Sequence, residues 1–228
     1  MNLKTTLVAS FAVFSPFASA QFGPGMTPPN TEYMPALFMN QKVVADMHLS
    51  PAVAQQEQSI LIQEGMKMLS TMGNRGQSVD RVKMAKAALA AYKSMSDKSL
   101  APLTPAQRVR YRQLSLQFFG PLALIQPKVT KQLEITPAQH AKMVAIIAKN
   151  SRQVAASMPK PGSNANGYMS GYQNVMQAQA RARASEEAQM KAVLTRGQRA
   201  KWAAMQGRIL PGIDNPLAGF GGMMGGMH

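Results

Sequence analysis

Residues 103–108 read LTPAQR, residues 135–140 read ITPAQH, and residues 194–199 read LTRGQR. In each segment a threonine is followed three places later by a glutamine. A threonine hydroxyl in this position can accept a hydrogen bond from a backbone N–H of the first helical turn, and the glutamine side chain can reach back to the threonine N–H. The three segments therefore predict three capping boxes, each of which starts a helix and contributes about 1 kcal/mol to it.

The similarity between the segments continues along the chain. Three places after each glutamine comes a base, and a large side chain follows it: Arg110 and Tyr111, Lys142 and Met143, Lys201 and Trp202. The segment Leu49-Ser50-Pro51 begins in the same way, but its Gln55 comes two places late, so we give it little weight as a fourth copy. Agreement of this extent indicates an internal repeat rather than chance capping.

Apolar residues at helical spacing predict the remaining elements. We expect a short helix over residues 36–47 and a short connector from 122 to 133. Further helices are expected to begin near Ser50, near Ser78 or Asp80, and near Thr104, Thr136, Met169 and Thr195. No segment favours a strand. The predicted fold class is all-α: an elongated bundle of long antiparallel helices, arranged as helical hairpins, with disordered ends.

The ends of the chain differ in composition from its centre. Residues 1–20 carry Lys4 as their only charge, then an apolar stretch and a final ASA, which is the pattern of a secretory signal cleaved after Ala20. Residues 21–35 are rich in proline and read as an extended leader, and residues 208–228 read as a flexible Gly/Met-rich tail. The sequence therefore predicts a periplasmic or secreted protein with one helical domain over residues 36–207.

Charge and cysteine content exclude several classes of function. The chain holds 25 Lys and Arg against 10 Asp and Glu, a formal charge of +15, and it has no cysteine. Disulfides, thiol nucleophiles and Cys-ligated metals are therefore impossible. The bases are dispersed and aromatic residues are few, so we expect no nucleic-acid binding. An exported basic protein is more apt to meet anionic lipid, polysaccharide or acidic, partly unfolded protein.

The repeated signature resembles that of the Spy/CpxP family of periplasmic proteins, also called LTxxQ-motif proteins. The matching residues are Leu103, Thr104, Gln107, Ile135, Thr136, Gln139, Leu194, Thr195 and Gln198. This chain departs from the pattern in its greater length, in Ile135 in place of leucine, and in Gly197, which weakens the third box. Members of the family form long-helix hairpins that dimerise into a thin, curved cradle. Several are ATP-independent chaperones, and others dampen envelope-stress signalling or respond to metals.

The resemblance implies a non-enzymatic chaperone or envelope-stress protein whose partners are partly unfolded envelope proteins, with a homodimer as one expected assembly. A surface that mixes bases with flexible methionine side chains suits weak binding of many clients. We take Arg108, Arg110, Arg112 and Lys142 as candidate client-binding residues. This hypothesis needs no cofactor.

Two other functions stay open. Thioether and imidazole groups in the tail could bind a soft metal such as Cu(I), with Met223, Met224, Met227 and His228 as candidate ligands. A metal-responsive binding or sensing protein is therefore the first alternative. The second is a structural envelope protein that its basic surface holds on an anionic polymer.

Enzyme motifs find little support in the sequence. Glu186 and Glu187 are adjacent on a predicted helix, so their carboxylates point in different directions. No nucleophile-elbow motif is present. The Gly-rich residues 219–226 lack the following lysine and helix of a phosphate-binding loop. We therefore expect no catalytic residue.

Overall fold

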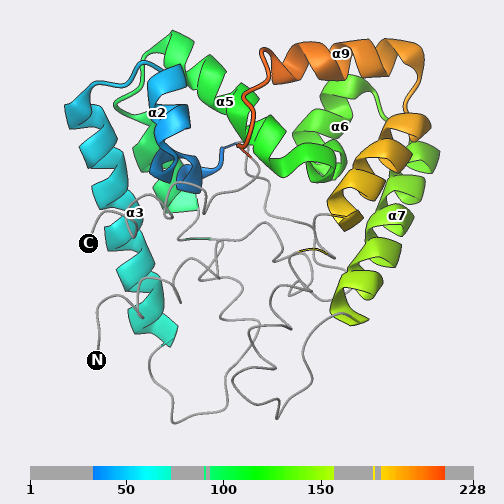
Figure 1. The fold of residues 1–228 in the computed structure, drawn as a ribbon, viewed down its shortest axis with the longest axis horizontal. Helices are drawn as coiled ribbons and strands as arrows, with labels where there is room; N and C mark the ends of the chain where they lie inside the picture. Colours follow the sequence, from blue (N-terminus) through cyan, green and yellow to red (C-terminus); the bar gives the residue numbers. More distant parts are fainter. Residues whose placement is uncertain (1–32, 73–89, 91–92, 157–176, 178–180, 214–228) are drawn as a thin grey trace. The chain divides into compact units, whose positions relative to one another are not determined.

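The computed structural model describes residues 33–72, 90, 93–156, 177 and 181–213. These described residues form helices joined by turns and short connections, with no strand among them, so the predicted all-α class is confirmed (Figure 1). The elongated arrangement of hairpins stays a prediction. Within this described part, every helix is too short or too polar to cross a membrane. The predicted signal segment, residues 21–32 of the predicted leader, the starts of the helices predicted near Asp80 and Met169, and residues 214–228 of the tail lie outside the described residues.

Contacts divide the chain into two compact units. Of the described residues, the first unit takes 33–118 together with 206–213, and the second unit takes those within 119–205. The sequence predicts one helical domain over residues 36–207, and the described part of that range falls into both units.

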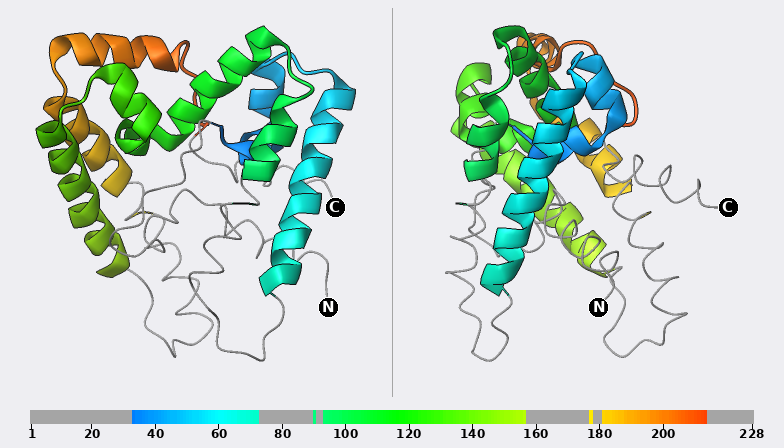
Figure 2. Two further views of the ribbon diagram at one scale, coloured as in Figure 1. Left: turned by 180° about the vertical axis from the view of Figure 1, so that it is seen from behind. Right: turned by 90° about the vertical axis from the view of Figure 1, so that its left-hand side faces the viewer.

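The first unit contains η2 (Pro35–Met39), α2 (Gln41–Asp46), α3 (Pro51–Met72), a helix over residues 93–100, and α5 (Pro105–Phe119). The predicted helix over 36–47 is interrupted at Asn40, whose side chain accepts a hydrogen bond from Lys42 N and so starts α2. Helix η2 packs against both α2 and α3 (Figure 2). The core of this unit is made by side chains that are fully buried, among them Phe38, Val43, Tyr111, Leu114 and Phe118.

The second unit contains η3 (Gly120–Ile125), α6 (Pro127–Leu133), α7 (Pro137–Ala156), a helix over residues 181–193, and α9 (Arg196–Gln206). The prediction of a connector from 122 to 133 is wrong, because these residues are largely helical. Pro127 stands at the first position of α6, where its missing N–H costs nothing. Helix η3 packs against α6 and α7. Buried core residues include Leu124, Leu133, Met143, Met190 and Trp202.

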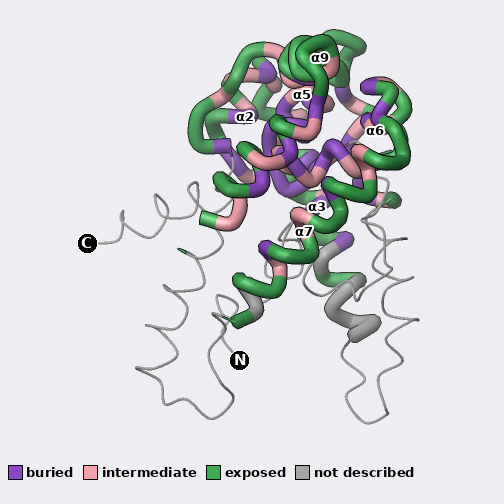
Figure 3. Tube along the Cα trace, turned by 90° about the vertical axis from the view of Figure 1, so that its right-hand side faces the viewer, coloured by how far each residue is buried: buried purple, intermediate pink, exposed green. Residues whose placement is uncertain are grey.

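Burial follows one face of α3 and of α7, whereas the five consecutive residues 114–118 of α5 are all buried (Figure 3). In α7, Met143 and Asn150 are buried two turns apart, whereas Val144 and Lys142 are exposed. In α3 the buried positions are Glu57, Leu61 and Glu64. The carboxylates of Glu57 and Glu64 therefore face the interior together with Leu61. This is unusual, because acidic side chains mostly lie at the protein surface.

The two units share one local structure. His48 follows α2 and Glu134 follows α6, and both adopt left-handed backbone angles, with φ of 50° and 55°. The next residue in each case closes the helix end with a backbone hydrogen bond, from Leu49 N to Val44 O at 3.1 Å and from Ile135 N to Thr130 O at 3.0 Å. Ser50-Pro51 and Thr136-Pro137 then open the next helix. The segment that begins at Leu49 is therefore a structural counterpart of the motif.

Candidate functional site: the paired helix starts

Two capping boxes lie together in the second unit. Thr136 N donates to Gln139 Oε1 at 3.0 Å, and Gln139 N donates to Thr136 Oγ1 at 3.2 Å. Thr195 and Gln198 exchange the same pair of bonds at 2.9 and 3.2 Å. Both threonines therefore stand just before their helices and satisfy N–H groups of the first turn, as the sequence predicts.

Each of these glutamines also ties its helix to the chain that precedes the other helix. Gln139 Nε2 donates to Val193 O at 2.9 Å, and Gln198 Nε2 donates to Leu133 O and Glu134 O, both at 3.2 Å. The two amides also bond each other, at 2.8 and 3.2 Å. A primary amide carries an acceptor and two donors, so glutamine can cap one helix and tie the other, whereas glutamate cannot donate when ionised.

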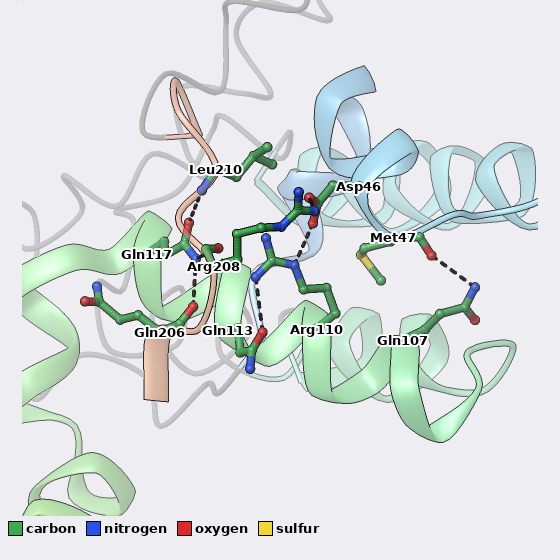
Figure 4. A network of polar contacts seen from close by, with 9 residues as sticks. All are labelled: Asp46, Met47, Gln107, Arg110, Gln113, Gln117, Gln206, Arg208 and Leu210. Carbon is green, nitrogen blue, oxygen red and sulfur yellow. Dashed lines mark hydrogen bonds and ion pairs between the residues drawn. The ribbon is translucent and has the colours of Figure 1, made fainter. Parts of the chain in front are cut away.

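The first unit contains a one-sided version of this arrangement. Thr104 N donates to Gln107 Oε1 at 3.0 Å, and Gln107 N donates to Thr104 Oγ1 at 3.3 Å. Gln107 Nε2 lies 3.3 Å from Met47 O and 3.4 Å from His48 O (Figure 4). On the opposite side, Ser50 Oγ caps α3 by accepting from Val53 N at 3.3 Å. Val53 occupies the place of the motif glutamine. Helix α3 therefore has no glutamine at this position that could bond the chain before α5 in return.

Arginine adds a further tie at two of the helix starts. Arg108 Nε donates to Leu103 O at 3.0 Å, and an Arg199 guanidinium nitrogen donates to Leu194 O at 2.6 Å. Leu103 and Leu194 are themselves buried. The leucine, threonine, glutamine and arginine of these two copies therefore act together as a helix start with a buried apolar anchor.

We expect Gln198→Ala to destabilise the second unit by about 2 kcal/mol, because it removes both the cap and the tie to α6. Gln198→Glu keeps the acceptor and loses the donor, so about 1 kcal/mol is expected. The free energy of unfolding of both variants is measured by urea unfolding, followed by the fluorescence of Trp202. Trp202 is the single tryptophan and lies on the same helix as Gln198.

Gln189→Ala serves as the control for these two variants, because among the described residues the Gln189 side chain bonds only Ser185, one turn away at 2.7 Å. It should cost less than about 0.5 kcal/mol. A loss for Gln198→Ala no larger than that of the control would contradict a tying role.

Gln117 holds the C-terminal segment onto the first unit (Figure 4). Its buried amide nitrogen donates to Gln206 O at 2.7 Å and to Arg208 O at 2.9 Å, and its oxygen accepts from Leu210 N at 2.9 Å. Ile213 is buried further along. Residues 208 and 210, which the sequence assigns to a flexible tail, are therefore bonded to α5, and we call residues 208–213 the strap. Nothing in the sequence indicated this contact, because the strap makes it with backbone groups, which every residue carries.

A buried carboxylate joins α2, α5 and this strap. Asp46 Oδ2 lies 2.6 Å from Arg110 Nε, and Asp46 Oδ1 pairs with the exposed Arg208. Arg110 also donates to Gln113 Oε1 at 3.1 Å. Asp46 gave no signal in the sequence, because its partners lie far away along the chain.

The four candidate client-binding bases occupy different settings. Arg108 and Arg110 lie on α5, each with the internal bonds described above, and Arg112 on the same helix is half-buried. Lys142 is exposed on α7 in the second unit. Arg110 is therefore the least available of the four, since its side chain is largely enclosed and paired.

Two buried glutamates carry raised pKa values. Burial raises the pKa of Glu57 to about 7, against a smaller opposing effect of the Ser99 hydroxyl. Burial likewise raises the pKa of Glu186 to about 7, opposed by the Asn150 side chain and by the positive charge of Arg183. Sequence reasoning missed Glu57, although its helical spacing from the apolar Leu61 was a usable signal.

The described residues offer no assembled metal centre: no group of three or more His, Asp or Glu among them could hold an ion. The tail candidates Met223, Met224, Met227 and His228 lie outside the described residues, so a metal site there stays a prediction. No protein-family model, curated protein or solved structure matches the chain.

Proposed function

We propose that this chain is an exported, non-enzymatic protein of the Spy/CpxP type that binds partly unfolded client proteins without ATP. The observation that supports this function best is a set of large apolar side chains left exposed on helices that also carry bases. Such a mixed surface can attract an unfolded chain by charge and hold its apolar groups weakly.

Helix α3 carries the clearest example. Ile62 and Met66 are 46% and 65% exposed and stand one helical turn apart, so they share a face. Lys67 lies beside them, with its ammonium group 2.7 Å from Glu64. The apolar pair is therefore next to a charge that is already partly neutralised, which lowers the cost of placing an apolar client segment against it.

Two exposed valines lie on other helices that also carry bases. Val109 on α5 is 60% exposed and lies between Arg108 and Arg110 in the sequence. Val144 on α7 is 43% exposed, and the exposed Lys142 precedes it by two places. Each unit thus offers its own exposed apolar residues on helices that also carry bases, and a client has more than one point of attachment.

The double variant Ile62→Ser, Met66→Ser should weaken client protection. We expect at least about a threefold rise in the concentration of the chain that halves the aggregation of a chemically unfolded model client, because the removed apolar contacts are worth about 1 kcal/mol in total. Light scattering during dilution of the client from denaturant measures this concentration.

The matched control is Gln56→Ser, Gln63→Ser, which places two serines at exposed polar positions of the same helix. It should leave protection unchanged. If the unmodified chain does not slow aggregation at equimolar ratio, the proposed function is wrong; if both double variants lose protection equally, the apolar pair is not the contact.

A further inference from the structure

Glu57 is a buried acid that takes no part in the hydrogen bonds of the paired helix starts. Its side chain is 0% exposed, and neither carboxylate oxygen has a hydrogen-bond partner among the described residues. Ser99, on the helix of residues 93–100, is equally buried next to the Glu57 carboxyl, and its hydroxyl also lacks a partner of normal geometry within the described part of the chain. An ionised carboxylate in this setting gives up its hydration without compensation, which strongly favours the neutral form.

The second unit shows that the fold does not need these polar groups. Met143 stands at the same distance from Pro137 as Glu57 does from Pro51, and Met190 stands at the same distance before Leu194 as Ser99 does before Leu103. Both methionines are 0% exposed. An apolar pair therefore fills the equivalent place in one unit, and a titratable pair fills it in the other.

The charged groups around Glu57 are engaged elsewhere. On its own helix, Glu64 pairs with Lys67 at 2.7 Å. On the helix of residues 93–100, Lys98 pairs with the same Glu64 at 2.6 Å, and exposed Lys93 pairs with Asp97 at 2.6 Å. Helix η2, which packs against α3, carries no titratable side chain. On α5, Arg108 and Arg110 make the bonds described above. Arg112 on the same helix is half-buried, and Tyr111 is buried in the core.

We propose that Glu57 is a pH-sensitive latch of the first unit: its neutral carboxyl lets α3 pack tightly against the helix of residues 93–100, and its ionisation loosens that packing. The pKa of Glu57 is raised from 4.5 to about 7, mainly by burial. The folded unit therefore holds this proton more tightly than the unfolded chain does. The contribution of the neutral Glu57 carboxyl to the stability of the folded unit is therefore complete below about pH 4.5, and it is lost as the pH rises through about 7.

Hydrogen exchange of the full chain tests the latch directly. Peptides from residues 51–64 and 93–100 are followed at about pH 5.5 and about pH 8, and rates are corrected for the intrinsic pH dependence of amide exchange. With pKa values of 4.5 unfolded and about 7 folded, the opening constant of this helix pair should rise about 30-fold between the two conditions.

Glu57→Met installs the residue that the second unit carries at this position, and Glu57→Gln removes the charge while keeping the shape. Either variant should reduce the pH dependence to within about twofold. Asp97→Asn, an exposed acid on the facing helix, is the control and should keep the 30-fold response.

Three outcomes would overturn the latch. The unmodified chain could show no pH response in these peptides, or Glu57→Gln could keep the full response. A carboxyl carbon resonance of Glu57 that titrates below about pH 5 in the folded chain would also overturn it, whatever the variants do. The inference does not rest on the proposed function, because each readout concerns the first unit alone and no client is present.

Discussion

Asp46→Ala should destabilise the first unit by about 3 kcal/mol and release the C-terminal strap. Asp46 is buried and accepts from both Arg110 and Arg208, so its removal leaves the largely enclosed Arg110 guanidinium without its carboxylate. Breaking a buried ion pair from one side costs several kcal/mol, because the remaining charge is desolvated and unpaired. Hydrogen exchange in peptides over residues 33–47 and 105–118 measures the loss, and trypsin cleavage after Arg208 reports release of the strap.

Asp97→Ala is the matched control, because it removes an acid from a pair with Lys93 in which both side chains are exposed. An exposed pair of this kind contributes less than about 0.5 kcal/mol. Arg208→Ala separates the two bonds to Asp46, and loss of the exposed Arg208 side chain should cost less than about 1 kcal/mol. Because this variant lacks the trypsin site of the strap, hydrogen exchange over residues 206–213 reports release of the strap instead. A loss for Asp46→Ala below about 1 kcal/mol would show that Arg110 finds another partner.

Tyr111→Ala should destabilise the first unit by about 4 kcal/mol. Tyr111 is fully buried, its ring stacks on Tyr33 with centroids 5.2 Å apart, and it lies 4.6 Å from the ring of Phe38. Removing a ring from a packed core loses its transfer free energy and leaves a cavity, a combination that costs about 3–5 kcal/mol. Hydrogen exchange of α2 and α5 peptides, fitted against urea concentration, gives the value for this unit.

Tyr111→Phe keeps the ring and separates the cost of the cavity from that of the hydroxyl, so a loss below about 1 kcal/mol is expected. Trp202→Ala tests the corresponding place in the second unit, because the tryptophan follows Gln198 at the same distance as Tyr111 follows Gln107 and is also buried. A Tyr111→Ala loss no larger than that of Tyr111→Phe would contradict the central position of the ring.

The glutamines of the motif show how far local reasoning extends. Their bonds to Thr104, Thr136 and Thr195 were predicted from sequence, because cap and helix start lie within one turn. Their second role, the tie from Gln139 to Val193 and from Gln198 to Leu133, joins segments that are distant along the chain. No local pattern reports which segments meet, so the motif predicted three helices and not their pairing.

The segment that begins at Leu49 was given too little weight as a copy of the motif. Its missing glutamine argued against a fourth copy, yet Ser50 caps α3, and His48 adopts the same left-handed conformation as Glu134. The cap requires only a hydroxyl before the proline. The glutamine is needed for the tie, and in the first unit Gln107 supplies that tie from one side.

The sequence by itself determined that the chain is helical and where α3, α5, α7 and α9 begin, because hydroxyl, amide and proline side chains act on the backbone within a few residues of themselves. Only the tertiary structure decided that Glu57 is enclosed, that Asp46 joins two arginines, and that Gln117 holds residues 206–210. These features depend on contacts across long stretches of chain. Burial, which sets both the cost of an unpaired charge and the pKa of an acid, arises from such contacts alone.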